Sequence, residues 1–372
     1  MTKRKFYDPN QPGAQALRDS IVHGAVITAG TMVAFPTCFP NVTEAVRADE
    51  SFIRALDITP EGIVYAGTSG YASHLLVGMF HGITGMVFDL GVAEGATECT
   101  AICCGAKDVV AAVNGPTGGR LVRRPLQPLP FDLIQEWHMW RKPFQFTDVG
   151  GRILHAVTDA DRSTLIGTTE STLFTFNIQA GVLKTVGDIP AAGRIARGSG
   201  GNIFGRDGAE HLWKFDARSG QLTRKAVTLP KGDWTSAPML WARDESDGQG
   251  ALYLADARGT LFRFHEKTGF SAALATIPLS PIGAMAVTFD GRIFASAGDG
   301  IARMFCVHPE NGTVADLGVA VSVIERRRYG YCFGDAVVGR DGEIIFGEND
   351  DLGHVWLYFP KIERAGTAIL NS

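Results

Sequence analysis

The chain has 372 residues, a length that exceeds a typical single domain but suits a repeat fold that forms one unit. Apolar residues make up 45% and charged residues 20%, which permits a large buried core and argues against disorder. The formal net charge is −4 and the longest basic run is Arg326–Arg328, so nucleic acid is a poor partner. No stretch approaches the length of a membrane span, which argues against a membrane partner.

The 45 glycines exceed the usual share of about 7% and are spread along the whole chain, which indicates many tight turns. The six cysteines show neither a CxxC pair nor an even spacing, so the sequence predicts buried, reduced thiols. The first residues carry charge but no apolar signal segment. We therefore expect a cytoplasmic protein, or a secreted or periplasmic one if a leader has been removed.

One pattern of short apolar strands separated by turn residues recurs seven times along the chain. The units span 54–93, 98–126, 151–189, 193–229, 237–277, 281–320 and 326–359. Their turns include Asp290-Gly291, Asn311-Gly312 and Asp341-Gly342, which are typical of β-hairpins. Four short strands at a period of roughly 40–55 residues are typical of propeller blades. The second unit is the loosest, and residues 127–150 after it are rich in proline and aromatic residues, which predicts an irregular insertion.

The last unit lacks a convincing outer strand, whereas the β-rich segment 20–35 belongs to no unit. The sequence therefore predicts an all-β, seven-bladed propeller as a single domain over residues 1–372, with residues 1–19 as an extension. In it, segment 20–35 supplies the missing strand of the last blade, and this closure removes exposed sheet edges. A barrel or sandwich is the structural alternative, but neither explains why the outer turn recurs at a fixed place in each unit.

Two sets of loops share one rim of a propeller: those that enter the inner strands and those that join the second strand to the third. The inner-strand entries carry Arg54, Glu98, Arg152, Arg194, Arg326–Arg328, Tyr329 and Tyr331. The second-to-third loops carry mostly polar side chains, namely Tyr71, His74, Arg120, Glu170, Arg206, Asp207, His211, Asp256, Arg258, Asp299 and the stretch 348–354. His74, His211 and His354 all begin a third strand, a shared position that also suits a structural hydrogen bond to a neighbouring blade.

The last unit also contains a run of hard oxygen ligands, Glu348, Asn349, Asp350 and Asp351. Ca²⁺ is the metal that such ligands suit, although the spacing of a dedicated calcium motif is missing. We therefore expect no required cofactor, with Ca²⁺ as the one metal to test. The sequence contains no phosphate-binding loop, no G-x-S-x-G elbow and no H-E-x-x-H pair.

Seven four-stranded units with His, Tyr and Arg on one rim resemble the propeller polysaccharide lyases, a group that includes ulvan lyases and rhamnose–glucuronate lyases. The last unit, YGYCFGDAVVGRDGEIIFGENDDLGHVWLYFP, is most similar to the rhamnose–glucuronate type. The resemblance implies a carbon–oxygen lyase that acts on a uronate-containing oligosaccharide by β-elimination. In such enzymes a His or Tyr removes the C5 proton, an Arg neutralises the carboxylate, and the C4 substituent leaves.

The resemblance assigns roles to particular residues. His74 would be the catalytic base or acid, with Tyr331 or Tyr329 as its proton-transfer partner. The expected carboxylate clamps are Arg194, Arg328 and Arg152, because a planar guanidinium binds both oxygens. The expected substrate-binding side chains are Tyr71, Arg152, His211, His354 and Glu348.

Two other functions remain open. A gluconolactonase-like propeller hydrolase would need a Glu/Asn/Asn/Asp metal set on the inner strands, where Asn is sparse. A non-catalytic propeller would bind a glycan or a protein on its rim, although the Trp-Asp dipeptide of WD-repeat scaffolds is missing.

Overall fold

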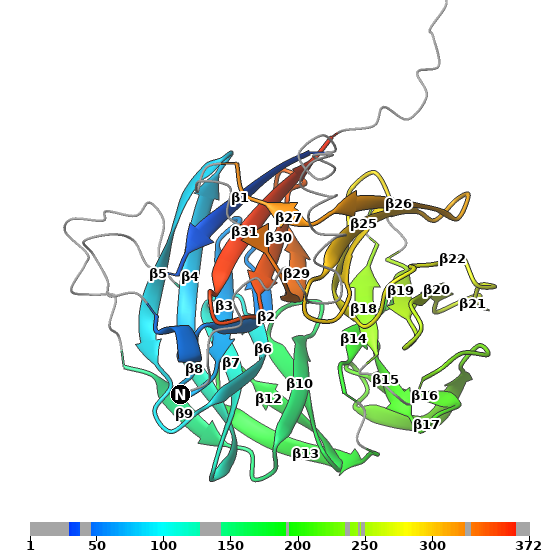
Figure 1. Ribbon diagram of the computed structural model, residues 1–372. Coiled ribbons are helices and arrows are strands. Elements are labelled where there is room, and N and C mark those ends of the chain that lie inside the picture. Colours follow the sequence, from blue (N-terminus) through cyan, green and yellow to red (C-terminus); the bar gives the residue numbers. More distant parts are fainter. Residues whose placement is uncertain are drawn as a thin grey trace, which may run out of the picture.

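The computed structural model describes residues 30–37, 46–126, 143–190, 193–234, 239–244, 246, 250–323 and 329–361. Within these ranges the fold is all-β, with the short 3-10 helix η1 (Ala48–Glu50) as its helical element. Seven sheets are arranged as the blades of a ring, which confirms the predicted seven-bladed propeller (Figure 1). No helix in the described ranges is both long and apolar enough to cross a membrane.

Blades 1 to 3 follow one another along the chain, each with its strands in sequence order from the inner to the outer edge. Blade 1 contains β2 (Phe52–Ile58), β3 (Val64–Ser69), β4 (His74–His81) and β5 (Thr84–Val92). Blade 2 contains β6 (Glu98–Cys104), β7 (Asp108–Gly115), β8 (Gly118–Pro125) and β9 (Gln145–Asp148). Blade 3 contains β10 (Ile153–Thr158), β11 (Thr164–Thr169), β12 (Thr172–Asn177) and β13 (Val182–Asp188).

Blades 4 to 6 repeat this antiparallel order. Blade 4 contains β14 (Ala196–Arg197), β15 (Ile203–Asp207), β16 (His211–Asp216) and β17 (Gln221–Thr228). Blade 5 contains β18 (Leu240–Arg243), β19 (Leu252–Ala255) and β20 (Thr260–His265), with β21 (Gly269–Phe270) and β22 (Ala275–Thr276) both paired to β20. Blade 6 contains β23 (Ile282–Val287), β24 (Ile293–Ala297), β25 (Arg303–His308) and β26 (Thr313–Gly318).

Blade 7 closes the ring with strands from both ends of the chain. It contains β29 (Phe333–Val338), β30 (Ile344–Glu348) and β31 (His354–Pro360), and its outer strand is β1 (Gly30–Pro36). The register of the antiparallel pair runs from Gly30 opposite Pro360 to Pro36 opposite His354, and Figure 1 shows blue β1 beside red β31. The predicted closure is therefore confirmed for residues 30–36. A two-stranded ribbon of β27 (Ala320–Val321) and β28 (Tyr329–Gly330) links blade 6 to blade 7.

The range 127–150 holds more than an irregular insertion, because β9 lies within it and is the outer strand of blade 2. The sequence prediction is wrong for this part of the range. Gln145–Asp148 pairs with β8 as the fourth strand of the other blades pairs with the third. The remaining residues 127–142, with Trp137 and Trp140, lie outside the described residues.

The core lies between neighbouring blades, where alternate strand residues face the next sheet. In the closing strand β1, Met32 packs in one cluster with Phe294, Phe346, Trp356 and Tyr358, so that β1, blade 6 and blade 7 share buried apolar surface. Cys99, Cys103, Cys104 and Cys306 are buried thiols, as predicted, whereas Cys332 is half-buried and Cys38 lies outside the described residues. Close approach of blades requires glycine at Gly67, where an added Cβ would collide with Cys99 of the next blade.

The inner strands of five blades each contain a β-bulge close to their first residues. The register shifts lie between Ile53/Ala55, Cys99/Ala101, Ile153/His155, Ile282/Ala284 and Phe333/Asp335. The residues inserted at these shifts are Arg54, Thr100, Leu154, Gly283 and Gly334. A bulge redirects a side chain relative to the regular alternation of a strand. The bulges therefore direct the side chains at these positions toward the mouth of the central channel.

Side chains also join the inner edge of one blade to the next. Backbone N–H groups on these edges donate to a side chain of the preceding blade, in the pairs Leu56 to Asp335, Cys104 to Asp57, Ile153 to Asn114 and Ile195 to His155. Edge N–H groups need acceptors when they are shielded from solvent. The channel wall from blade 7 round to blade 4 is therefore held by inter-blade hydrogen bonds as well as by apolar packing.

Candidate functional site

A cavity of about 280 Å³, which we call the upper basin, lies at the end of the channel where the inner strands begin. It is lined by Arg54, Glu98, Cys99, Thr100, Arg152, Leu154, Gly193 and Arg194. Four charged residues predicted at the inner-strand entries, Arg54, Glu98, Arg152 and Arg194, therefore meet in one cavity. The bulged positions Arg54, Thr100 and Leu154 are among the lining residues because the bulges turn them toward the channel.

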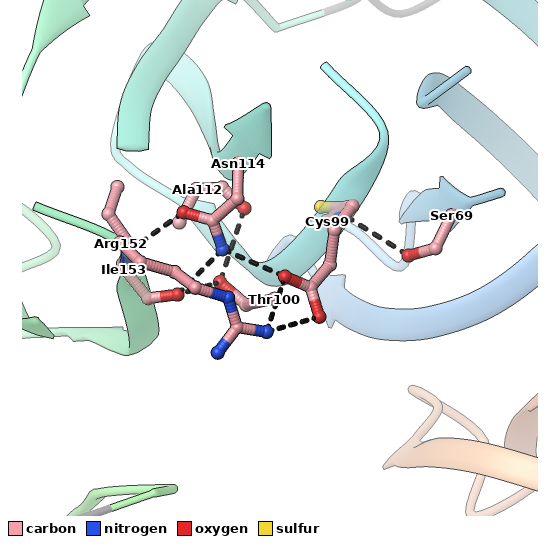
Figure 2. A network of polar contacts seen from close by, with 8 residues as sticks. Ser69, Cys99, Thr100, Ala112, Asn114, Arg152 and Ile153 are labelled. Carbon is pink, nitrogen blue, oxygen red and sulfur yellow. Dashed lines mark hydrogen bonds and ion pairs between the residues drawn. The ribbon is translucent and has the colours of Figure 1, made fainter. Parts of the chain in front are cut away.

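Glu98 is held in the basin by a network that joins blades 2 and 3 (Figure 2). Arg152, just before β10, donates from Nη2 to both carboxylate oxygens of Glu98, at 2.9 and 2.7 Å. Asn114 of β7 donates from Nδ2 to Glu98 at 3.0 Å and to the carbonyl oxygen of Ile153 at 2.8 Å. The Oδ1 atom of Asn114 accepts the Ile153 N–H at 2.8 Å. Glu98 thus has a fixed position, with a cation on its solvent side.

Two arginines of the upper basin retain hydrogen-bond donors for a ligand. Arg54 donates from Nε to the side-chain oxygen of Asn349 at 2.9 Å, and nothing in the described ranges accepts a hydrogen bond from its terminal nitrogens. Arg152 bonds through Nη2 alone, so its Nε and Nη1 have no acceptor among the described residues. The lining contains three guanidinium groups and one carboxylate; since Arg194 is paired with Asp335, Arg54 and Arg152 against Glu98 leave one positive charge in excess. This donor-rich arrangement suits a carboxylate ligand.

Arg194 crosses the channel from blade 4 to the opposite side of the ring. Its Nη1 bonds Oδ1 of Asp335 in blade 7 at 2.7 Å, and its Nη2 donates to the carbonyl oxygen of Gly334 at 2.5 Å. Nη2 also reaches the carbonyl oxygen of Arg54 in blade 1 at 3.4 Å. The indole Nε1 of Trp241 holds the Arg194 carbonyl at 3.1 Å. The guanidinium of Arg194 is thus bound to Asp335 and serves as a tie across the channel, and its role as a substrate clamp stays a prediction.

Below this tie lies a second cavity of about 230 Å³, which we call the lower cavity. Its lining includes Asp57, His155, Arg197, Trp241, Arg243 and Asp335, and Arg194 borders both cavities. Burial and the charge of Arg194 lower the pKa of His155 to about 3, so this imidazole is neutral. The sequence predictions did not include His155 because they considered loops and strand entries alone. One feature of the sequence could have indicated it. His155 is a polar residue within the apolar inner strand ILHAVT, at the same position as Asp335 in the inner strand FGDAVV.

His74 does not line either cavity, and its role as the catalytic base stays a prediction. It begins β4, the third strand of its blade, and is 8% exposed. Its Nδ1 lies 2.8 Å from Asp89 Oδ2 and its Nε2 lies 3.0 Å from Glu50 Oε2. Burial opposes the charged form, but the carboxylates of Asp89 and Glu50 outweigh it and raise the pKa of His74. With both ring nitrogens occupied, His74 ties η1 and β5 to β4 and leaves no lone pair for a substrate proton.

His354 and Glu348 are also removed from the substrate by burial, at 6% and 0% exposed. The His354 N–H donates to Glu348 Oε2 at 3.0 Å, and His354 Nδ1 lies 3.2 Å from the same oxygen. Both side chains are enclosed in blade 7 and line neither cavity, and their binding of substrate stays a prediction. His211 begins β16 as expected but borders neither cavity.

The predicted tyrosines lie on the rim and not in the basin. Tyr71 is 79% exposed, and its N–H donates to the Asp49 carbonyl at 2.7 Å. Tyr329 pairs with Val321 in the β27–β28 ribbon, and the Tyr331 carbonyl accepts the Ala302 N–H at 2.7 Å. Neither Tyr329 nor Tyr331 borders the upper basin. Their predicted role in proton transfer therefore has no support in the geometry, and Arg328 lies outside the described residues.

The acidic stretch 348–351 does not assemble a metal site. Among the described residues, no group of three or more His, Cys, Asp or Glu side chains is placed to hold a metal ion. Asn349 binds Arg54, and Asp350 Oδ1 accepts the Leu352 N–H at 2.8 Å. Burial, together with the charge of Glu348, raises the pKa of Asp350 to about 7. Asn349 and Asp350 thus have structural contacts, and the weak Ca²⁺ candidates Glu348, Asn349, Asp350 and Asp351 form no ligand set of this kind among the described residues.

Comparison with known proteins shows the fold and no closer relationship. Neither a model of a protein family nor a curated protein matches the sequence. Among solved structures, a streptogramin B lyase superposes with a TM-score of 0.61 at 10% identity, covering 90% of this chain and 99% of the other. A catalytically inactive histidine-to-alanine variant of virginiamycin B lyase from Staphylococcus aureus, solved with quinupristin, gives 0.59 at 10% identity and covers 89% and 99%. The WD40 β-propeller domain of Doa1 gives 0.56 at 11% identity and covers 88% and 99%.

Proposed function

We propose that the protein is a lyase that binds a uronate-containing oligosaccharide in the upper basin and cleaves it by β-elimination. The observation that supports this most is the set of unused guanidinium donors on Arg54 and Arg152 beside the Glu98 carboxylate, in one cavity of about 280 Å³. The predicted role of Arg152 as a carboxylate clamp is kept, and Arg54 replaces Arg194 as its partner. Glu98 replaces His74 as the proton acceptor.

The first step is recognition of the uronate carboxylate. Arg54 and Arg152 would donate charge-assisted hydrogen bonds to its two oxygens, and these bonds are about twice as strong as neutral ones. A bound carboxylate competes with Glu98 for Arg152. When Arg152 turns toward the substrate, an oxygen of Glu98 loses its cationic partner and becomes available to accept a proton, while Asn114 keeps the side chain in place.

The second step is elimination. The C5–H bond lies next to the carboxylate, so neutralising that carboxylate by two guanidinium groups stabilises the negative charge that develops when the proton leaves. Glu98 takes the C5 proton, the electron pair forms the C4–C5 double bond, and the C4–O bond breaks. The departing oxygen takes a proton from solvent, so the products are an unsaturated uronate and a sugar with a free hydroxyl group.

The structural neighbours support lyase chemistry only in general terms. Two of them are named as lyases, but at 10% identity the likeness concerns the fold and says nothing about a uronate substrate. The choice of substrate class therefore rests on the charge of the upper basin. Its excess positive charge, with Arg54 and Arg152 against Glu98, favours an acidic sugar over a neutral one.

The proposal is tested by incubating the protein with a panel of uronate-containing oligosaccharides and following the ultraviolet absorbance of the conjugated double bond. Glu98→Gln, which keeps an oxygen for Asn114, should abolish turnover without lowering Tm by more than a few degrees. Arg54→Ala should raise KM by about 10- to 100-fold, the loss expected for one charged hydrogen-bond donor. Arg258→Ala is the matched control, because Arg258 is exposed on the same rim but does not border the basin.

These measurements distinguish binding of the uronate from its cleavage by elimination. Saturable binding of uronates that depends on Arg54, without any ultraviolet signal across the panel, would leave a non-catalytic glycan-binding propeller. Full activity of Glu98→Gln would remove Glu98 as the base. Absence of both binding and turnover would refute the proposed function.

A further inference from the structure

Asn114 lies where the proposed base and the proposed carboxylate clamp meet. It belongs to β7, where it is paired with Glu98 of β6 in the antiparallel register, and its carbonyl oxygen accepts the Thr97 N–H at 2.8 Å. Asn114 is 5% exposed and does not line the upper basin, whereas the side chains of Glu98 and Arg152 are 22% and 49% exposed. Any effect of Asn114 on a ligand must therefore pass through the two side chains beside it.

The side-chain amide of Asn114 has one orientation, because both of its ends are bonded. Nδ2 donates to Glu98 Oε2 at 3.0 Å and to the Ile153 carbonyl oxygen at 2.8 Å, which uses both of its hydrogens (Figure 2). Oδ1 accepts the Ile153 N–H at 2.8 Å. Turning the amide over would place an acceptor against two acceptors and a donor against a donor. The donor that faces Glu98 is thus fixed by the backbone of blade 3.

The same contacts fix the backbone on both sides of Arg152. Ile153 is bonded to Asn114 through both its N–H and its carbonyl oxygen. On the other side, the Gly151 carbonyl oxygen accepts the Gly119 N–H at 3.1 Å. Glycine is required at position 119 because an added Cβ would lie 2.4 Å from this oxygen. The backbone of Arg152 is therefore held against blade 2, while its half-exposed guanidinium can turn within the basin.

The two carboxylate oxygens of Glu98 differ in their partners. Oε2 accepts hydrogen bonds from Asn114 and Arg152, whereas Oε1 accepts one from Arg152 alone within the described ranges, at 2.9 Å. In the proposed reaction Arg152 turns to the uronate carboxylate, so Oε1 loses its partner and Oε2 keeps Asn114. A carboxylate held by one fixed donor retains its position, and its free oxygen has a lone pair for a proton.

We propose that Asn114 is a positioning residue of the upper basin: it directs Glu98 so that Oε1 accepts the C5 proton, and it sets the distance between this base and Arg152. This inference rests on the proposed lyase function. As the Oε1–H bond forms, the C5–H bond breaks, its electron pair forms the C4–C5 double bond, and the C4–O bond breaks. The departing oxygen gains a proton from solvent and Glu98 returns its proton to solvent, so no other reactant is needed.

The first test measures kcat and KM of Asn114→Ala by ultraviolet absorbance, on the uronate oligosaccharide that the wild-type protein cleaves. We expect kcat to fall by about 10- to 100-fold, because a base misplaced by about 1 Å can lose about 100-fold in rate. KM should rise less than in Arg54→Ala, since both guanidinium groups remain. Asn202→Ala is the matched control and should match the wild type. Its Nδ2 also donates to a glutamate of the next blade, Glu266, but neither residue lines the basin.

The second test uses Asn114→Asp and measures the pH dependence of kcat, which a purely structural role would not move. This substitution keeps an acceptor for the Ile153 N–H, so the protein should fold, but it places a second carboxylate beside Glu98. Two neighbouring carboxylates favour the protonated form of one of them. The acidic limb of the pH–rate profile should therefore move to higher pH by about one unit or more.

The outcomes separate this inference from the function on which it rests. Full kcat of Asn114→Ala, or a pH–rate profile of Asn114→Asp equal to that of the wild type, would overturn the positioning role while the lyase function stands. If Asn114→Ala does not fold, the profile of Asn114→Asp decides. A wild-type protein that binds uronates without cleaving them, or that does not bind them, would refute the lyase function and the positioning role with it.

Discussion

The ion pair between Arg194 and Asp335 ties blade 4 to blade 7 across the channel, and its removal gives a measurable loss of stability. Asp335→Asn keeps an oxygen for the Leu56 N–H but removes the charge that faces Arg194, and Arg194→Met removes the other partner. The side chains are 21% and 17% exposed, so solvent screens this pair only in part. We expect a coupling free energy of about 2 kcal/mol, between the values for exposed and fully buried pairs.

The expected shift in Tm follows from the size of the chain. At about 2.1 cal/mol/K per residue, 372 residues give an unfolding entropy of about 0.8 kcal/mol/K, so a loss of about 2 kcal/mol lowers Tm by about 3 °C. The assay is a double-mutant cycle of Asp335→Asn and Arg194→Met, measured by calorimetric unfolding. The matched control cycle is Glu98→Gln with Arg152→Met, whose side chains are 22% and 49% exposed and whose coupling should stay below about 1 kcal/mol. A coupling near zero for Arg194 and Asp335, or one no larger than the control, would refute the cross-channel tie.

Three further variants test buried side chains within the blades and their loops. The pKa of His74 is raised despite burial, by Asp89 and Glu50, so the stability it contributes is present below about pH 6.5 and is lost as the pH rises through the folded pKa. His74→Gln should therefore lower Tm more at about pH 6 than at about pH 9, and an equal loss at both would contradict this. Burial raises the pKa of Asp350 from 3.8 to about 7, so the folded state favours the protonated carboxyl group. The stability that this preference contributes is lost as the pH rises through about 7. Asp350→Asn should unfold at a higher Tm than the parent above that pH, and a lower Tm there would argue against the assignment. Met32→Ala, in the closing strand at 1% exposed, should cost about 2–5 kcal/mol in chemical denaturation, and a loss below about 1 kcal/mol would mean that β1 leaves the blade easily.

The ring and its closure were predictable from the sequence because their causes are local. Alternating apolar residues and Asp-Gly or Asn-Gly turns define each hairpin within a few residues. Residues 30–36 belong to no repeat unit, and the last blade was the one that lacked an outer strand, so their pairing with β31 could be expected. The topology of a propeller also fixes which end of each inner strand faces the rim. For this reason Arg54, Glu98 and Arg152 could be expected in one cavity.

The chemistry of the site was less predictable because it depends on contacts between distant segments. His74 stands at a rim position, but Glu50 and Asp89 come from other elements and enclose it. The bulges that turn Arg54 and Leu154 into the basin have no clear signature in the sequence. His155 is a single polar residue in an apolar strand, and burial together with the charge of Arg194 from the next blade lowers its pKa and keeps it neutral.

The most direct test of the proposed function compares the affinity of the protein for a uronate disaccharide with its affinity for the neutral disaccharide of the same linkage. If Arg54 and Arg152 bind the carboxylate, the acidic sugar should bind at least about tenfold more tightly, and Arg54→Ala should remove this preference. Equal affinity for the two sugars, or a preference that survives Arg54→Ala and Arg152→Ala, would contradict the assignment of the upper basin.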